Sequence, residues 1–447
     1  MATFKGKQNC DCAICSKQQG FEVGTELLDD LLGGKVTLFV GAGVSTESKN
    51  VYKETFLERR AAELGIDPKI GFPAVMQRYC AQTNGRMKLL QEIRTHFEHI
   101  DSFPEMHREA RKFHRELGTF HPVRNIITTN WDTYFERFCM ATPFVVDPDL
   151  AFWEAADRRV LKLHGSVTNF GSIVATEADY TACAKRLHKG MIGALLKTLL
   201  ATQTVIFIGY SLTDSDFKVI YDFVRKQMMT LHRQSYVITP FADEAETFKL
   251  AGLIPIVTDG TYFVEQIKKH AVQCDAMLDD EVFDAAWEFF DLVDHEHQRL
   301  HARLKPSKFP QIMYAAAYQD GLMHALERAA AMRGSGKYSR PHEFHLKIQS
   351  YLEWQRAKLR RGNYEDVAYI EGYVNGLLFM LMRPKERKGI PLYYAFGAKE
   401  ELCSFNQYLS FLRRTPDAHK ASLKRAVRKY SELSDPDSMV IHHPPWL

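Results

Sequence analysis

The sequence predicts an α/β domain with a doubly wound parallel sheet and a helical insertion, followed by an all-helical C-terminal domain. Two observations predict the sheet: short apolar runs recur through roughly the first 275 residues, and helical stretches separate them. Strands covered by helices on both faces read as continuous apolar runs, because neither face meets water. A third observation predicts the second domain, since beyond this point apolar residues recur at helical spacing.

Six segments of the first part have the character of strands, and the repeated strand–helix order is typical of a Rossmann-like sheet. Residues 51–120 show few strand signals and many helical ones, so we expect a helical insertion that caps the ligand edge of the sheet. The six predicted strands are Val36–Val40, Asn125–Thr129, Val160–Leu163, Thr204–Ile208, Tyr236–Thr239 and an edge strand at Ile254–Val257.

Length and composition bound the class of protein. A chain of 447 residues is too long for one ordinary core, which favours two domains, and 45% hydrophobic with 25% charged residues is typical of a globular protein. No apolar run approaches the roughly 18–20 residues that span a membrane. The N-terminus lacks the apolar core of a signal peptide. We therefore expect a cytoplasmic location and cysteines that are free or bind metal rather than form disulfides.

The two parts of the chain carry opposite charge. Residues 301–447 hold 24 Lys and Arg against 14 Asp and Glu, a balance of +10, whereas residues 1–300 hold 34 against 41, a balance of −7. The basic part would suit an acidic partner or the acidic part of a neighbouring subunit. Its predicted helices are Asp284–Leu304, Gln311–Met332, His342–Arg360, Glu365–Met382 and Asp417–Leu433.

A glycine turn directly follows the first predicted strand. Gly41 and Gly43 flank Ala42, and Ser45 and Thr46 come next. Without a Cβ in the way, a pyrophosphate can approach the main-chain N–H groups, and the hydroxyls can add donors. Small residues after a buried strand are common for structural reasons alone, so this turn by itself is weak evidence. A GxGxxG pattern is absent, which disfavours an ordinary Rossmann dehydrogenase.

Polar loops follow three more of the predicted strands, at residues 128–132, 163–165 and 209–216. Because parallel strands end at one edge of a sheet, the polar side chains of all four loops should converge on one cleft. Structural roles compete with this interpretation: a histidine picked from the 18 present is usually structural, and an asparagine or aspartate often caps a helix. The side chains expected in the cleft are Ser45, Asn130, Asp132, His164, Ser211 and Asp216.

In this order, the blocks GAGVS, TTNWD, LKLHGS and IGYSLTDSDF resemble the signature blocks of the Sir2 (sirtuin) superfamily over roughly residues 22–272. The likeness is closer to the bacterial Sir2-like domains of antiphage defence proteins than to deacylase sirtuins. Deacylases read TQN-[IV]-D where this chain has Trp131, and they carry a GIPDFR stretch that is missing here. Their four-cysteine zinc module is also missing, because residues 165–205 contain only Cys183, so no zinc is expected.

The resemblance implies an NAD+ glycohydrolase that releases nicotinamide and ADP-ribose. It implies that His164 acts as the base, that Asn130 orients the water or the nicotinamide amide, and that Asp132 binds ribose or stabilises developing charge. An NAD-dependent deacylase, an ADP-ribosyltransferase and a non-catalytic module that senses NAD or ADP-ribose are the alternatives. The expected NAD-binding residues are Gly41, Ala42, Gly43, Ser45, Thr46, Gly209, Ser211 and Asp216.

The resemblance also implies a setting: depletion of cellular NAD during infection (abortive infection), held in check by a partner. The resemblance implies that this chain forms a large homo-oligomer and works beside a HerA-type ATPase. That ATPase must be a separate chain, because no GxxxxGK[ST] pattern occurs here. Clusters of Lys and Arg near the C-terminus usually form a solvent-exposed face of a protein, so we do not expect this chain to bind nucleic acid directly.

Three domains follow from these expectations. Residues 1–21 are an N-terminal extension with Cys10, Cys12 and Cys15, whose spacing favours no metal over a zinc site completed from elsewhere. Residues 22–274 are the Sir2-like domain, and residues 275–447 are the helical domain for oligomerisation or partner binding.

Overall fold

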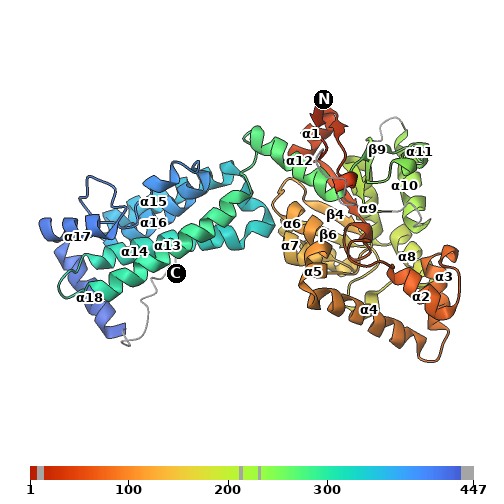
Figure 1. Cartoon of the computed structure of the whole chain (residues 1–447), viewed down its shortest axis with the longest axis horizontal. Coiled ribbons are helices and arrows are strands. Elements are labelled where there is room, and N and C mark those ends of the chain that lie inside the picture. Colours follow the sequence, from red (N-terminus) through yellow and green to blue (C-terminus); the bar gives the residue numbers. More distant parts are fainter. Residues whose placement is uncertain (8–14, 211–214, 230–232, 434–447) are drawn as a thin grey trace. The chain divides into compact units, whose positions relative to one another are not determined.

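The computed structural model describes residues 1–7, 15–210, 215–229 and 233–433. The chain divides into two compact units (Figure 1). The first, here called the sheet unit, comprises Met1–Cys274 together with Gly334–Gly336. The second, called the helical unit, comprises Asp275–Arg333 and the residues from Lys337 onward.

The sheet unit is built on a seven-stranded sheet in which every strand pairing is parallel. The strand order is β5-β6-β4-β3-β7-β8-β9, so β4, β5 and β6 lie on one side of β3, with β6 between β4 and β5, and β7, β8 and β9 follow on the other side. This is the predicted doubly wound arrangement, with β9 as the predicted edge strand. The strands are β3 (Val36–Val40), β4 (Asn125–Thr128), β5 (Thr142–Phe144), β6 (Arg159–Lys162), β7 (Thr204–Ile208), β8 (Ser235–Thr239) and β9 (Ile254–Val257).

Three short strands were not predicted. The edge strand β5 has three residues, of which two are exposed, so it lacks the continuous apolar run that marks a central strand. An antiparallel pair near the N-terminus, β1 (Ala2–Phe4) with β2 (Phe21–Val23), brings together segments that are separate in sequence. Pairing of this kind depends on tertiary contacts rather than on a local pattern.

Helices cover the sheet on both sides. Phe39, Ile127 and Phe207 pack against Leu196 and Leu200, and α6, α7 and α12 lie on the side opposite α8 and α10 (Figure 1). The helices outside the insertion are α1 (Thr25–Leu32), α7 (Tyr134–Cys139), α8 (Glu177–Lys189), α9 (Met191–Thr202), α10 (Ser215–Met228), α11 (Ala245–Leu250) and α12 (Gly260–Gln273).

The region between β3 and β4 forms the predicted helical insertion. Val75, Leu89 and Ile93 share a core with Ile173 and Ala175, which follow β6. The insertion therefore packs onto a loop from the carboxyl edge of the sheet. Its helices are α2 (Phe56–Leu64), α3 (Phe72–Cys80), α4 (Gly85–Ser102), α5 (Pro104–Ala110) and α6 (Lys112–Gly118).

The described residues of the helical unit contain the five predicted helices and an additional one, α17, in a stretch for which no helix was predicted. At its centre α14 and α16 approach closely, because glycines of each helix face the backbone of the other: a Cβ on Gly321 would lie 2.0 Å from the Tyr369 carbonyl oxygen. The helices are α13 (Glu281–Arg303), α14 (Ile312–Ala331), α15 (Pro341–Arg360), α16 (Tyr364–Leu381), α17 (Phe405–Arg414) and α18 (Lys420–Leu433).

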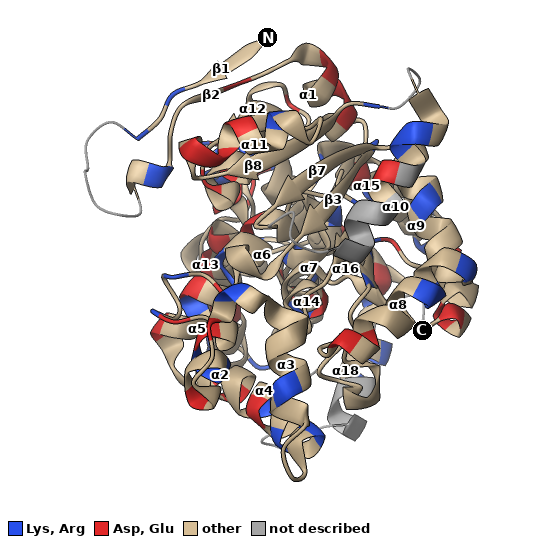
Figure 2. Ribbon diagram, turned by 90° about the vertical axis from the view of Figure 1, so that its right-hand side faces the viewer, with Lys and Arg blue, Asp and Glu red and all other residues tan. Residues whose placement is uncertain are grey.

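Charge is distributed as expected for a sheet buried between helices. The central strands β3, β7 and β8 carry no acidic or basic residue and are tan along their length, whereas blue and red residues occur on the surrounding helices (Figure 2). Across the described part of the chain, no helix is both long enough and apolar enough to cross a membrane.

The close approach of α14 and α16 gives a first prediction. A Cβ at Gly372 would lie 1.8 Å from the Tyr318 carbonyl oxygen, so Gly372→Ala must push the two helices apart. We expect the free energy of unfolding to fall by about 1–3 kcal/mol, measured by urea denaturation. Gly389→Ala is the control, because the nearest atom to a Cβ there lies 3.6 Å away. Equal stability of both variants would contradict this account of the packing.

Candidate active site

The carboxyl ends of four neighbouring strands form one level row. Val40 of β3 pairs with Thr128 of β4 and with Ile208 of β7, and Thr128 pairs in turn with Lys162 of β6. The loops that leave this row therefore start at the same edge of the sheet, where ligands bind in folds of this class. The residues two positions beyond the row are Ala42, Asn130, His164 and Tyr210.

Three hydrogen bonds join these four loops to one another. The Gly43 N–H donates to the Gly209 carbonyl at 3.2 Å, linking the loops after β3 and β7. The Asn130 side-chain amide donates to the Ser45 hydroxyl at 3.4 Å, linking the loops after β3 and β4. The Val167 N–H donates to the Trp131 carbonyl at 2.9 Å, linking the loops after β4 and β6. The four loops thus form one connected surface.

The glycine turn can approach the loop after β7 closely because Gly41 has no side chain. A Cβ on Gly41 would lie 2.3 Å from the Gly209 carbonyl oxygen, so any larger residue would separate the loops after β3 and β7. Gly43 is exposed, which leaves its backbone open to a ligand, whereas Ser45 and Thr46 are buried beneath the turn. The Ser45 hydroxyl also contacts the Ala42 carbonyl at 3.4 Å.

Asn130 is held by the strand that precedes it. Its N–H donates to the Thr128 hydroxyl at 3.0 Å, and that hydroxyl donates to the Val40 carbonyl at 2.7 Å. The residue is 5% exposed, and its side-chain oxygen Oδ1 is buried without a hydrogen-bond partner among the described residues. A buried amide oxygen without a partner costs free energy, so its presence favours a ligand that donates to it.

Asp132 lies deeper in the same loop. Its Oδ1 accepts a hydrogen bond from the Tyr134 N–H at 3.0 Å, at the start of α7, so Asp132 rather than Asn130 contacts the beginning of this helix. Its other carboxylate oxygen, Oδ2, is buried and has no hydrogen-bond partner in the described structure. Burial raises the pKa of Asp132, and the charge of Lys162 opposes that rise.

His164 follows β6 at the level of Asn130. Its ring packs edge-on against Tyr180, with 4.9 Å between the ring centroids, and its carbonyl accepts a hydrogen bond from the Val174 N–H at 3.0 Å. Burial, together with the charge of Arg186, lowers the pKa of His164 to about 3. The imidazole is therefore neutral at physiological pH.

Some of the predicted residues lie beyond what the structure describes. Ser211 lies outside the described residues, and the backbone of Asp216 is in α10 while its side chain is not described. Cys10 and Cys12 also lie outside, and Cys15 is in a short 3-10 helix, Cys15–Lys17. Within the described ranges, no group of three or more His, Cys, Asp or Glu side chains could hold a metal ion.

Two further residues belong to the site by geometry and were missed by sequence reasoning. Lys162 is buried at the end of β6 and contacts the loop that carries Asn130 and Asp132, and Glu136 of α7 pairs with it at 2.9 Å. The available signal was a charged residue among the apolar residues of the predicted strand Val160–Leu163, because a charged side chain is rarely buried unless it is paired.

Part of the chain matches a known protein family. Residues 124–255 match the family model described as a SIR2-like domain. This part of the chain is a SIR2-like domain. The match includes β4, β6 and β7 and the loops that carry Asn130, Asp132 and His164.

Three curated relatives resemble about half of this chain. Defense-associated sirtuin 2 of Bacillus subtilis is 26% identical over 236 residues, which are 50% of this chain and 22% of that protein. NAD(+) hydrolase ThsA of Enterococcus faecium is 27% identical over 213 residues, 46% of this chain and 43% of that protein. ThsA of Cytobacillus dafuensis is 28% identical over 220 residues, 47% and 42% of the two chains. This chain therefore covers less than half the length of each relative.

The buried histidines of this domain predict how stability depends on pH. Burial lowers the folded-state pKa of His114 to about 3, as it does for His164, whereas an unfolded histidine titrates near 6.5. Their contribution is complete above pH 6.5 and is lost as the pH falls from there toward 3, by up to about 1.4 kcal/mol per pH unit for each histidine.

The measurement is urea denaturation of wild type and His114→Phe between pH 7 and 5, above the range in which most carboxylates titrate. His114→Phe should flatten the decline, because phenylalanine binds no proton in the unfolded state. The exposed His188 supplies the control variant, His188→Ala, which should keep the wild-type slope. Identical slopes for wild type and His114→Phe would show that His114 is not held neutral by the fold.

Proposed function

We propose that this chain is an NAD+ glycohydrolase, which cleaves NAD+ to nicotinamide and ADP-ribose. One observation carries the proposal: Asn130 Oδ1 and Asp132 Oδ2 are buried without hydrogen-bond partners in the described structure, in a loop joined to a glycine turn. Phosphate, amide and sugar groups are the ligand chemistry that such an edge accepts. The similarity to proteins named NAD(+) hydrolase supports the choice of NAD+.

In this proposal the glycine turn binds the pyrophosphate. The Ala42 N–H would donate to the pyrophosphate, and the neighbouring Gly43, which is exposed, would bring no side chain into its way at the carboxyl end of the central strand β3. Gly209, whose carbonyl is bonded to the Gly43 N–H, supports the turn from the next strand. The nicotinamide ribose would then lie toward the loops after β4 and β6.

The reaction breaks the bond between the nicotinamide nitrogen and the ribose C1′. The bonding electron pair goes to the pyridinium ring, which leaves as neutral nicotinamide, and positive charge develops on the ribose. The Asp132 carboxylate would stabilise this charge, and the Asn130 amide would orient the attacking water or the leaving amide. The water oxygen bonds to C1′, and its proton passes to His164, the proposed base.

The burial of His164 leaves its imidazole neutral, although a pKa near 3 makes it a weaker base than one that titrates near neutral pH. A neutral imidazole accepts a proton, and a pKa lowered to about 3 keeps it neutral throughout the physiological range. The ionised state of Asp132, rather than that of His164, would therefore limit activity on the acid side, because burial raises the pKa of the carboxyl.

We further propose that the activity depletes NAD+ in antiphage defence, as in abortive infection, and that a partner controls it. The likeness to Defense-associated sirtuin 2 supports the setting. The basic balance of residues 301–447, +10, supports an acidic partner surface for this part of the chain, either on a HerA-type ATPase or on a neighbouring subunit of a homo-oligomer. Nicotinamide release by the purified chain, alone and with the product of the adjacent gene, tests this control; equal rates would exclude it.

The catalytic assignment predicts a loss of activity on two substitutions. Asn130→Ala and His164→Ala should each lower nicotinamide release by about 10²–10⁴-fold, because one removes the orienting amide and the other the base. The measurement is chromatography of the products after incubation with NAD+, which also identifies ADP-ribose. His188→Ala, at an exposed position of α8, should retain wild-type activity.

Several results would contradict the proposal. Wild-type release from His164→Ala would remove the proposed base. Cleavage that depends on an added acylated peptide would indicate a deacylase instead. Tight NAD+ binding without cleavage, with biological activity intact in His164→Ala, would indicate a sensing module.

A further inference from the structure

Lys162 occupies an unusual position for a charged residue. It is the last residue of β6, between β4 and β5 in the sheet, and it is 1% exposed. The strand residues before it, Val160 and Leu161, are fully buried. Placing an ammonium group here costs free energy unless it is paired and hydrogen-bonded, so its contacts should indicate what it does.

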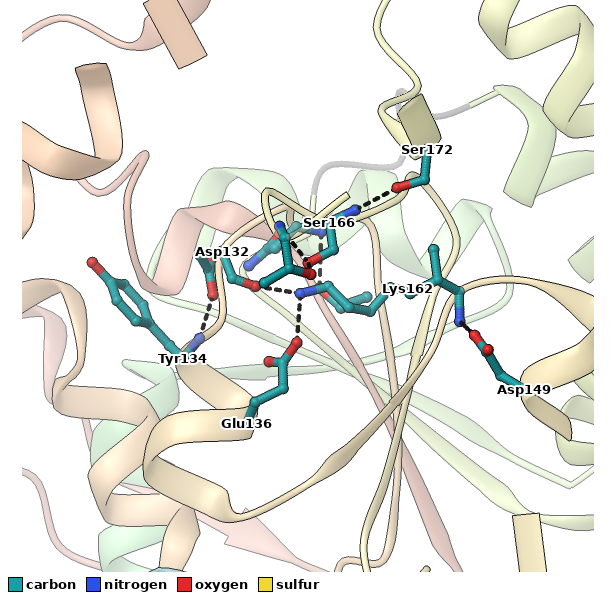
Figure 3. Close-up of polar contacts among 11 residues, drawn as sticks. Asp132, Tyr134, Glu136, Asp149, Lys162, Ser166 and Ser172 are labelled. Atoms are coloured by element: carbon teal, nitrogen blue, oxygen red, sulfur yellow. Dashed lines mark hydrogen bonds and ion pairs between the residues drawn. The ribbon is translucent and has the colours of Figure 1, made fainter. Parts of the chain in front are cut away.

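The ammonium group of Lys162 joins three elements (Figure 3). It donates to the backbone carbonyl of Asp132, in the loop after β4, and it forms an ion pair at 2.9 Å with Glu136 Oε1 of α7. Lys162 therefore ties the end of β6 to the loop that carries the two unpartnered oxygens and to the helix that follows it. Moving this loop would require breaking a buried hydrogen bond to a charged donor.

The same ammonium also sets the local charge. Burial raises the pKa of both Asp132 and Glu136, and Lys162 is the charge that opposes the rise at each carboxyl. Asp101 of α4 raises the pKa of Asp132 further. Tyr134 donates its N–H to Asp132, and the neutral His114 of α6 also lies within the influence of Lys162.

We propose that Lys162 is a positioning residue of the SIR2-like domain: it holds the segment Asn130–Asp132 against β6 and keeps the Asp132 carboxylate ionised beside the ribose. This inference rests on the proposed function. Lys162 acts through Asp132 and need not touch the substrate. With both carboxyls ionised, the cluster of Lys162, Asp132 and Glu136 carries a net negative charge, which favours the cationic sugar of the transition state.

The experiment compares three variants of the full chain. Lys162→Met removes the cation, and Glu136→Gln removes the neighbouring negative charge while Lys162 stays. Lys268→Met is the matched control, because Lys268 is also buried and donates to a backbone carbonyl and a carboxylate, both of Glu116, in the contact between α12 and α6. Nicotinamide release is measured as kcat/KM from pH 5 to 9, together with Tm and with NAD+ binding by calorimetry.

The expected shifts have opposite signs. Lys162→Met should move the acid limb of kcat/KM up by about one pH unit or more, because Asp132 then loses its cationic neighbour. Glu136→Gln should move the acid limb to lower pH. Asp132 is then the one carboxylate of the pair that interacts with the charge of Lys162, and its pKa should fall. Lys268→Met should lower Tm as Lys162→Met does but leave the pH profile at its wild-type position. At pH 7 the kcat of Lys162→Met should fall by about tenfold or more, since the loop loses its anchor.

Each outcome tests the positioning role of Lys162. An unchanged acid limb in Lys162→Met, or equal shifts in Lys162→Met and Lys268→Met, would overturn the positioning role while the NAD+ glycohydrolase proposal stands. If Lys162→Met does not fold, Glu136→Gln decides alone, and an upward or absent shift would overturn the inference. If wild type binds NAD+ without cleaving it, the pH dependence of the Kd replaces that of kcat/KM. A wild-type chain that neither binds nor cleaves NAD+ would overturn both proposals.

Discussion

The parallel register of β6, β4, β3 and β7 is the constraint on which the rest of the site depends. Because Val40, Thr128, Lys162 and Ile208 lie in one row, the chain leaves four strands at one level of the sheet. The loops that follow these strands therefore lie close enough to hydrogen-bond to one another, and three such hydrogen bonds are present. A shift of one residue in any of these pairings would turn the polar side chains to the other face and break these links.

Burial shifts the pKa values of two side chains at the carboxyl edge of the sheet. A solvated histidine and a solvated aspartate would both be ordinary titrating groups, but here the surroundings lower the pKa of His164 and raise that of Asp132. The arrangement thus gives a neutral imidazole and a carboxyl whose raised pKa is opposed by the Lys162 charge and by hydrogen bonds from Tyr134 and Asn130. Part of the cost of burying Asp132 is offset by the Tyr134 N–H at the start of α7, which donates to its carboxylate, and the Lys162 ammonium at the end of β6 donates to its backbone carbonyl.

The helical insertion contributes to the site through aromatic packing, in addition to the charge of Asp101. Trp131, between the two polar residues of its loop, packs with Phe72 of α3 at 5.7 Å between ring centroids and edge-on to Phe56 of α2. The loop after β4 is therefore held from two sides, by the Lys162 ammonium group within the sheet and by aromatic contacts from the insertion. These contacts explain how a short, polar loop keeps its buried oxygens in place.

The sequence by itself determined the fold class, the six main strands, the helical insertion and the polar residues that end four of the strands. It did so because buried parallel strands and glycine turns leave local patterns that do not depend on distant residues. The tertiary structure alone decided that Asp132, rather than Asn130, contacts the start of α7, that β5 joins the sheet, and that Lys162 reaches the loop after β4. These features depend on contacts between segments separated by many residues, and the protonation states depend on burial, which a local sequence pattern does not contain.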